Sequence, residues 1–268
     1  MATLLRWAPC VEQQRLQLSG RRLSVARHNA SGTVSAMCVN YLTVNDARRY
    51  ESDFGVQRPP GPWASELYPK SRGTFIRRRA DEVGLEREAA LGTWGLLPWF
   101  AKTPEIKFNT VNARSETVAA AASYKAPWAR GQRCIVPMDA FFEPNWETGK
   151  HIRWKFSRRD GGTIGVAGLW ERWRGKGDQE ITTYTLLTVN ADDHPMMSRM
   201  HRLDKEKRML ALLDPAEYDE WLERPPAGAF ELLQEYPPEL LLDEPWPKPP
   251  AERSLALEEM ADVLMPDN

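Results

Sequence analysis

The chain has 268 residues, of which 42% are apolar, and its formal net charge at pH 7 is −1. This length and apolar fraction are typical of a globular protein with one large domain or two small ones. Because no run of 18 or more apolar residues occurs, the sequence excludes a membrane-spanning helix, and we expect no membrane partner.

The net charge conceals three unlike segments. Residues 1–36 carry five Arg and one Glu, whereas residues 229–268 carry ten acidic residues and only two basic ones. We therefore expect a folded, mildly basic domain over residues 37–228, followed by an acidic, Pro-rich tail that is partly disordered. Residues 1–36 resemble a transit peptide, translated upstream sequence or a removed pro-segment. We favour an extension that is absent from the native protein.

The three cysteines, Cys10, Cys38 and Cys134, are too widely spaced for a disulfide framework or a zinc site. This usage indicates a reducing, intracellular setting. We therefore expect a cytoplasmic protein. We also expect it to be a monomer that needs no metal or cofactor and, if it is bacterial, to associate with the nucleoid.

Several helices and loops can be predicted in chain order. We expect a short helix within Tyr41–Tyr50, with Asn45 or Asp46 near its start. A second helix should run from Ser115, as N-cap, to about Ser123. A third should begin at Asp214, with Pro215 and Glu217 following it, and end near Leu222. Asp192–Lys207 reads as a polar loop.

The remaining pattern is rich in β-strands. Gly73–Arg78 and Glu180–Val189 read as strands, Glu86–Leu91 is ambiguous, and Trp94–Phe100 reads as a strand broken by proline. Further strands are expected over Arg133–Phe142, where Glu143-Pro144 should end the strand, over a hairpin of His151–Phe156 with Thr163–Leu169, and over Arg208–Leu213. The predicted fold is α+β, with curved antiparallel sheets forming an open barrel-like core and a few short flanking helices.

Cys38 follows Met37, so removal of that methionine would leave one residue with a free α-amine and a thiol. Both groups are nucleophiles near neutral pH, and together they can condense with an aldehyde to form a thiazolidine ring. The alternative is that Cys38 is a small buried hydrophobic residue, as we expect for Cys134.

Other candidate site residues are weaker signals when taken singly. Glu143 follows an apolar strand and could carry protons, while His201 lies among basic residues. Asn112 and Arg114 precede the helix expected at Ser115, and a helix N-terminus attracts anions such as phosphate. Each of these residues could equally serve a structural role.

Five motifs occur together in one order: Met-Cys, Trp-Gly-Leu-x-Pro-Trp, Asn-Ala-Arg-x-Glu, Arg-Cys-x-x-Pro leading to Phe-x-Glu, and a late His before Arg-Met. Over about residues 37–224 this set resembles the SOS response-associated peptidase (SRAP) family. The resemblance implies a sensor of abasic sites in single-stranded DNA, whose N-terminal cysteine crosslinks to the ring-opened sugar.

The resemblance also implies a role for each matching residue. Cys38 would be the nucleophile, with its amine positioned by Asn112, while Glu143 would shuttle protons and His201 would assist ring opening. For DNA binding it implies phosphate contacts by Arg114 and Arg208, a contact by Asn40, and a base-stacking wedge formed by Trp99 and Phe100. This chain has Val39-Asn40 where the family usually has Gly-Arg, and a longer spacing between His201 and Arg208.

Two other functions remain open from the sequence. One is a cysteine peptidase that acts on its own N-terminus, with Glu143 or His201 activating Cys38. The other is a non-catalytic module that binds single-stranded DNA through its basic residues and tryptophans.

Overall fold

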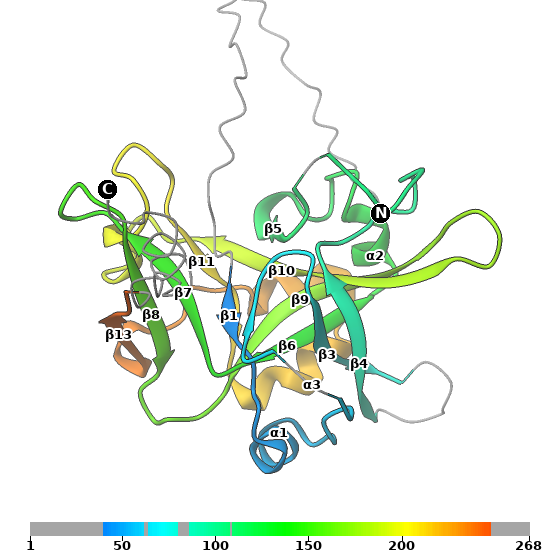
Figure 1. Ribbon diagram of the computed structural model, residues 1–268, viewed down its shortest axis with the longest axis horizontal. Helices are drawn as coiled ribbons and strands as arrows, with labels where there is room; N and C mark the ends of the chain where they lie inside the picture. Colours follow the sequence, from blue (N-terminus) through cyan, green and yellow to red (C-terminus); the bar gives the residue numbers. More distant parts are fainter. Residues whose placement is uncertain (1–39, 62–63, 80–85, 108, 248–268) are drawn as a thin grey trace, which may run out of the picture. The chain divides into compact units, whose positions relative to one another are not determined.

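The computed structural model of the protein describes residues 40–61, 64–79, 86–107 and 109–247, which form two curved β-sheets with short helices around them (Figure 1). The smaller sheet has five strands in the order β13-β8-β7-β1-β2, and the larger has eight. The predicted α+β class is confirmed. No helix in the described part of the chain is long and apolar enough to cross a bilayer.

The strands and helices have the following bounds. The smaller sheet consists of β1 (Tyr41–Leu42), β2 (Glu66–Leu67), β7 (Ala140–Asn145), β8 (Ile152–Arg158) and β13 (Leu241–Pro245). The larger consists of β3 (Arg72–Arg78), β4 (Arg87–Trp94), β5 (Asn112–Arg114), β6 (Arg133–Met138), β9 (Ile164–Arg174), β10 (Glu180–Asn190), β11 (Arg208–Leu210) and β12 (Leu212–Leu213). The α-helices are α1 (Ala47–Phe54), α2 (Lys125–Ala129), α3 (Tyr218–Glu223) and α4 (Pro226–Ala229), and the 3-10 helices are η1 (Ser115–Thr117), η2 (Met197–Arg199), η3 (Pro215–Glu217), η4 (Phe230–Leu232) and η5 (Pro238–Leu240).

Five strands of the larger sheet close into a barrel in the order β10-β4-β3-β6-β9. Closure is possible because β10 pairs with β4 along one edge and with β9 along the other. The β10–β4 pairing is parallel, and the other pairings of the circuit are antiparallel. The barrel is therefore closed rather than open as expected, and closure removes unpaired strand edges.

The buried core contains several aromatic side chains, among them Trp94, Trp128, Trp173 and Trp221. Trp94 and Trp221 are fully buried. The Trp94 indole N–H donates to the Val111 carbonyl and that of Trp221 to the Cys134 carbonyl, both at 2.9 Å.

Gly168 lies on β9, between β6 and β10, where an added Cβ would be 2.6 Å from the Thr185 carbonyl oxygen. This close approach of strands requires glycine.

The predicted helix starts had mixed outcomes. Asp214 forms the expected capping box, in which its carboxylate accepts from Ala216 N and Glu217 accepts from Asp214 N. The first helix begins after Asp46, which caps it as one of the two expected start residues, but it runs to Phe54, so the expected span of residues 41–50 was partly wrong. The helix expected from Ser115 was also wrong, because Ser115 is buried and only the short η1 forms there, without a side-chain cap.

The predicted hairpin of β8 and β9 was wrong in its pairing, although both strands exist. β8 pairs with β7 and β13, whereas β9 pairs with β6, β10 and β12 in the other sheet. The turn at residues 160–162 forms as expected, since Gly162 N donates to the Asp160 carboxylate at 2.9 Å. This turn thus carries the chain from one sheet to the other.

Two predicted strand ends also differ. Trp94 ends β4, so residues 95–100 form a loop rather than a broken strand. The strand through Glu143 continues to Asn145. Pro144 has no N–H to donate, but its nitrogen faces the side of β7 that pairs with β1, at a point beyond the start of β1. No hydrogen bond between β1 and β7 is therefore lost at this proline. The described residues of the expected tail include β13, which pairs with β8, so this sheet extends past the expected domain end at residue 228.

Candidate functional site

The chain enters the smaller sheet beside the strand that carries Glu143. β1 pairs with β7 in the register Tyr41 opposite Phe141, and Phe142 N donates to the Asn40 carbonyl at 3.3 Å. The buried Asn40 side chain donates to Glu66, whose carboxylate also accepts from Tyr68 Oη at 2.6 Å. Asn40 therefore lies opposite Phe142 where β1 meets β7, and Phe142 is the residue before Glu143.

Glu143 and His201 form a buried pair. Their exposed fractions are 3% and 6%, and Oε2 of Glu143 lies 3.0 Å from Nε2 of His201. The backbones are also joined, because His201 N donates to the Pro144 carbonyl at 2.7 Å and Met200 forms a bridge with Asn145. The carboxylate and the imidazole are therefore close enough to act together in accepting protons from a bound reactant and returning them.

His201 has an unusual backbone conformation, with φ of 58°. Positive φ is uncommon for residues other than glycine, and such strain persists only where surrounding contacts enforce it. In the described residues the same feature occurs outside glycine only at Lys70. The backbone contacts that enforce this φ angle at His201 therefore belong to the candidate site.

Asn112 and Arg114 lie on β5, which pairs in parallel with β10. Asn112 is buried, and its backbone carbonyl accepts from Tyr124 Oη at 3.1 Å. Arg114 is 45% exposed, and its guanidinium contacts the Glu206 carboxylate at 2.8 Å. Because no regular helix starts at Ser115, the expected helix N-terminus does not contribute to anion binding here.

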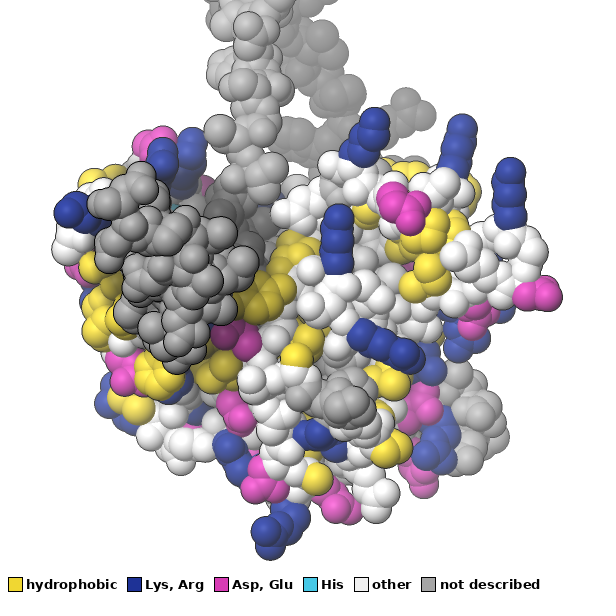
Figure 2. Space-filling model, viewed as in Figure 1, with side chains coloured by type: hydrophobic (Ala, Val, Ile, Leu, Met, Phe, Trp, Pro, Cys, Tyr) yellow, Lys and Arg dark blue, Asp and Glu magenta, His cyan; other side chains and the backbone are white. Residues whose placement is uncertain are grey.

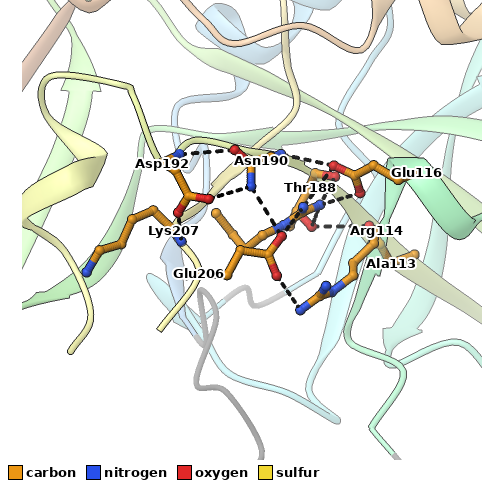
Figure 3. Close-up of polar contacts among 9 residues, drawn as sticks. Ala113, Arg114, Glu116, Thr188, Asn190, Asp192, Glu206 and Lys207 are labelled. Carbon is orange, nitrogen blue, oxygen red and sulfur yellow. Dashed lines mark hydrogen bonds and ion pairs between the residues drawn. The ribbon is translucent and has the colours of Figure 1, made fainter. Parts of the chain in front are cut away.

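Arg208 is buried in a network of polar groups that includes Glu116, Thr188 and Glu206, which are labelled in Figure 3. Its guanidinium donates to both oxygens of Glu116 at 2.8 and 2.9 Å, to Glu206 at 2.9 Å and to the Thr188 carbonyl at 2.7 Å. Burial raises the pKa of Glu116, but the hydrogen bonds and the charge of Arg208, together with the backbone N–H groups of Glu116 and Asn190, outweigh burial and leave that pKa below its usual value. Glu206 thus connects Arg208 to Arg114.

Trp99 and Phe100 form an exposed aromatic pair in the loop after β4. Their exposed fractions are 64% and 40%, and the ring planes meet edge to face with centroids 5.8 Å apart. Two hydrogen bonds fix the loop to barrel strands β10 and β9. Leu97 N donates to Thr183 Oγ1 at 3.0 Å, and Trp173 Nε1 donates to the Ala101 carbonyl at 2.9 Å. A rigid exposed aromatic pair can stack on bases of any sequence.

The structure groups the predicted residues in three places. It joins Glu143 to His201 and Arg114 to Arg208, while the aromatic pair occupies a loop of its own. Cys38 lies outside the described residues. Cys134 is buried, and burial raises the pKa of its thiol, as expected for an inert core cysteine.

The described residues contain no group of three His, Cys, Asp or Glu side chains arranged to hold a metal ion. Basic and acidic side chains are interspersed on the face shown in Figure 2.

Comparison with known proteins identifies the family. The model of the SOS response associated peptidase (SRAP) family matches residues 37–243 of this chain. This chain belongs to the SRAP family.

A crystal structure of a protein from Bordetella bronchiseptica is 37% identical, with a TM-score of 0.73, over 78% of this chain and 99% of that one. A protein from Gallus gallus named abasic site processing protein HMCES is 31% identical over 196 residues, which are 62% of this chain and 56% of that protein. The abasic site processing protein YoqW of Bacillus subtilis is 29% identical over 130 residues, which are 48% of this chain and 54% of that protein. The chain thus spans little more than half the length of these two relatives.

Sequence reasoning missed three residues of this SRAP site. Glu66 holds Asn40, Glu206 holds Arg114, and Lys207 binds the backbone around His201. Glu116 was visible as the last residue of the Asn-Ala-Arg-x-Glu motif, and its partner proves to be Arg208. Charged residues are usually solvated, so the sequence alone gives no signal that Glu66, Glu206 and Lys207 make such contacts.

The contact between Glu206 and Arg114 leads to a prediction about DNA binding in this SRAP protein. Replacing Glu206 by Gln removes a competing negative charge and leaves an oxygen for Arg208. Affinity for undamaged single-stranded DNA should rise about 1.4- to fivefold, the range for an exposed ion pair of ~0.2–1 kcal/mol. Fluorescence anisotropy with a labelled oligonucleotide measures it.

Glu51→Gln is the matched control, because Glu51 is an exposed carboxylate on α1, outside all three groups of site residues. If both variants gain affinity equally, the effect is one of net charge alone. Lower affinity in Glu206→Gln would contradict a role for Arg114 in binding phosphate.

Proposed function

We propose that this SRAP protein captures abasic sites in single-stranded DNA through a covalent bond to Cys38, once Cys38 is the first residue of the chain. The names of the relatives support the substrate, and the family match begins at residue 37. The observation that carries the proposal is the buried Glu143–His201 pair beside the strand that follows Cys38.

Chain geometry favours a reaction at this pair. Two residues of extended chain span at most about 7 Å, so Cys38 cannot lie far from Asn40. The Asn40 carbonyl is bonded to Phe142 N, which is adjacent to Glu143 in β7. The chain that follows residue 38 is thus joined to the strand that carries Glu143, which supports a reaction in which Glu143 accepts and returns protons.

The proposed reaction proceeds in two bond-forming steps. The α-amine of Cys38 adds to the aldehyde carbon of the ring-opened sugar, and loss of water gives an imine. The thiol then adds to the imine carbon, its proton passes to nitrogen, and a five-membered thiazolidine closes. Glu143 would move protons during imine formation, His201 would assist ring opening, and Asn112 would position the amine.

For binding of the strand we propose a direct phosphate contact by Arg114 and stacking of flanking bases on Trp99 and Phe100. Arg208 already binds Glu116, Glu206 and Thr188, so a phosphate would have to replace these partners. We therefore assign Arg208 no direct phosphate contact: it holds Glu206, which occupies Arg114 until a phosphate takes its place.

A second candidate function is a cysteine peptidase that removes its own N-terminal segment. The description of the family as a peptidase favours it, and a His–carboxylate pair can activate a thiol. Under this hypothesis, a chain expressed from Met1 should lose mass with time, and the loss should end at residue 37.

One experiment distinguishes these functions. Protein that begins at Cys38, confirmed by intact mass, is incubated with single-stranded oligonucleotides with and without one abasic site. We expect a heat-stable shifted band with the abasic oligonucleotide alone. Equal, heat-sensitive binding of both would indicate a non-catalytic DNA-binding module, and no adduct together with shortening of the chain expressed from Met1 would indicate the peptidase.

A further inference from the structure

Lys207 occupies an unusual position at the end of the segment that separates His201 from Arg208. Its side chain is buried, and Nζ donates to three successive backbone carbonyls, those of Met200 at 2.7 Å, His201 at 3.2 Å and Arg202 at 2.9 Å. The ammonium group has three N–H donors, so these contacts use all of them.

The same residue is fixed to the core through its backbone. Lys207 N donates to the Asp192 carboxylate at 2.7 Å, and the Lys207 carbonyl accepts from Ala191 N at 2.9 Å. Asp192 in turn is bonded to Asn190 at the end of β10 (Figure 3). Lys207 therefore connects the end of a barrel strand to the backbone on both sides of His201.

We propose that Lys207 is a positioning residue for His201. The positive φ of His201 turns the chain so that three carbonyls converge on one point, and the Lys207 ammonium occupies that point. The ammonium thereby stabilises a conformation that a non-glycine residue rarely adopts, and it holds the imidazole 3.0 Å from Glu143. The effect on DNA capture rests on the proposed function, whereas the effect on His201 does not.

The first test is structural and needs no DNA. NMR signals of the His201 ring are compared in the free protein, in Lys207→Met and in Lys205→Met. Lys205 belongs to the same segment but is 40% exposed and pairs with Asp204, so it is the matched control. We expect the His201 signals to shift in Lys207→Met alone; unchanged signals there would overturn the proposal.

The second test measures adduct formation in a single turnover with abasic oligonucleotide. Lys207→Met should slow the reaction about 10- to 100-fold, the scale for a displaced catalytic group, with affinity for undamaged DNA within twofold. Lys207→Arg, which keeps a cationic donor, should recover most of the rate. In a His201→Ala background Lys207→Met should cause no further loss, because the two residues act as one unit.

The outcomes separate the two proposals. If the unmodified protein forms no adduct, the proposed function fails, and the NMR comparison still decides the role of Lys207. If the adduct forms but Lys207→Met slows it equally with and without His201, Lys207 acts through general stability and the inference is wrong. Should Lys207→Met not fold, Lys207→Gln replaces it, and the same shift of His201 signals is required.

Discussion

Replacing Cys38 by serine, in protein that begins at residue 38, is expected to abolish the heat-stable adduct with abasic DNA. The serine variant keeps the α-amine and can form an imine, but it lacks the thiol that closes the thiazolidine. The remaining imine hydrolyses on heating. Denaturing gel electrophoresis after heating, with and without prior borohydride reduction, measures both species.

Two comparisons make this prediction specific. Cys134→Ala should retain the adduct, because that thiol is buried and its pKa is raised by burial. Uncleaved protein that begins at Met1 should form none, because the nitrogen of Cys38 is then a planar amide without basic character. A stable adduct from Cys38→Ser or from the uncleaved chain would refute the 1,2-aminothiol mechanism.

Replacing Glu143 by glutamine is expected to slow adduct formation about 10²–10⁴-fold, the usual contribution of a general acid or base. Glutamine has nearly the same shape and can still contact His201, but it cannot move a proton. Affinity for undamaged DNA should stay unchanged. Single-turnover rates with excess protein measure the chemical step directly.

Glu147→Gln is the matched control for Glu143→Gln. Glu147 is a nearby carboxylate that is 47% exposed, lies 3.7 Å from Arg199 Nη1 and accepts from the Asn145 side chain at 2.8 Å, but it does not belong to the Glu143–His201 pair. Its substitution should leave the rate within about twofold, as for surface changes of ±0.5 kcal/mol. A normal rate in Glu143→Gln would mean that Glu143 serves only to hold His201.

The sequence predicted most strands, because alternation and β-branched composition are local signals. It did not predict their partners. The turn at Asp160 looks like a hairpin turn, yet β8 and β9 join different sheets, because closure of the barrel gives β9 the long neighbour β10. Pairing depends on contacts between distant segments, and no local pattern records them.

The site shows the same division. The motifs identified Glu143 and His201 singly, but their 3.0 Å contact depends on the bridge between Asn145 and Met200, which joins segments far apart in the chain. Serine often caps helix N-termini, but Ser115 is buried and does not cap a regular helix. By contrast, the Asp214 capping box is formed within four residues and was predicted correctly.

The ion pair between Arg114 and Glu206 has a consequence for measurements at different ionic strengths. An arginine that neutralises a phosphate releases a condensed cation from DNA, and the slope of log K against log salt counts such events, at about −0.7 each for single strands. In the proposed complex a phosphate displaces Glu206 from Arg114, which leaves Arg208 as the remaining arginine partner of that carboxylate and increases its attraction for a cation from solution. This uptake offsets part of the release, so the slope for this protein counts fewer phosphate contacts than the complex contains.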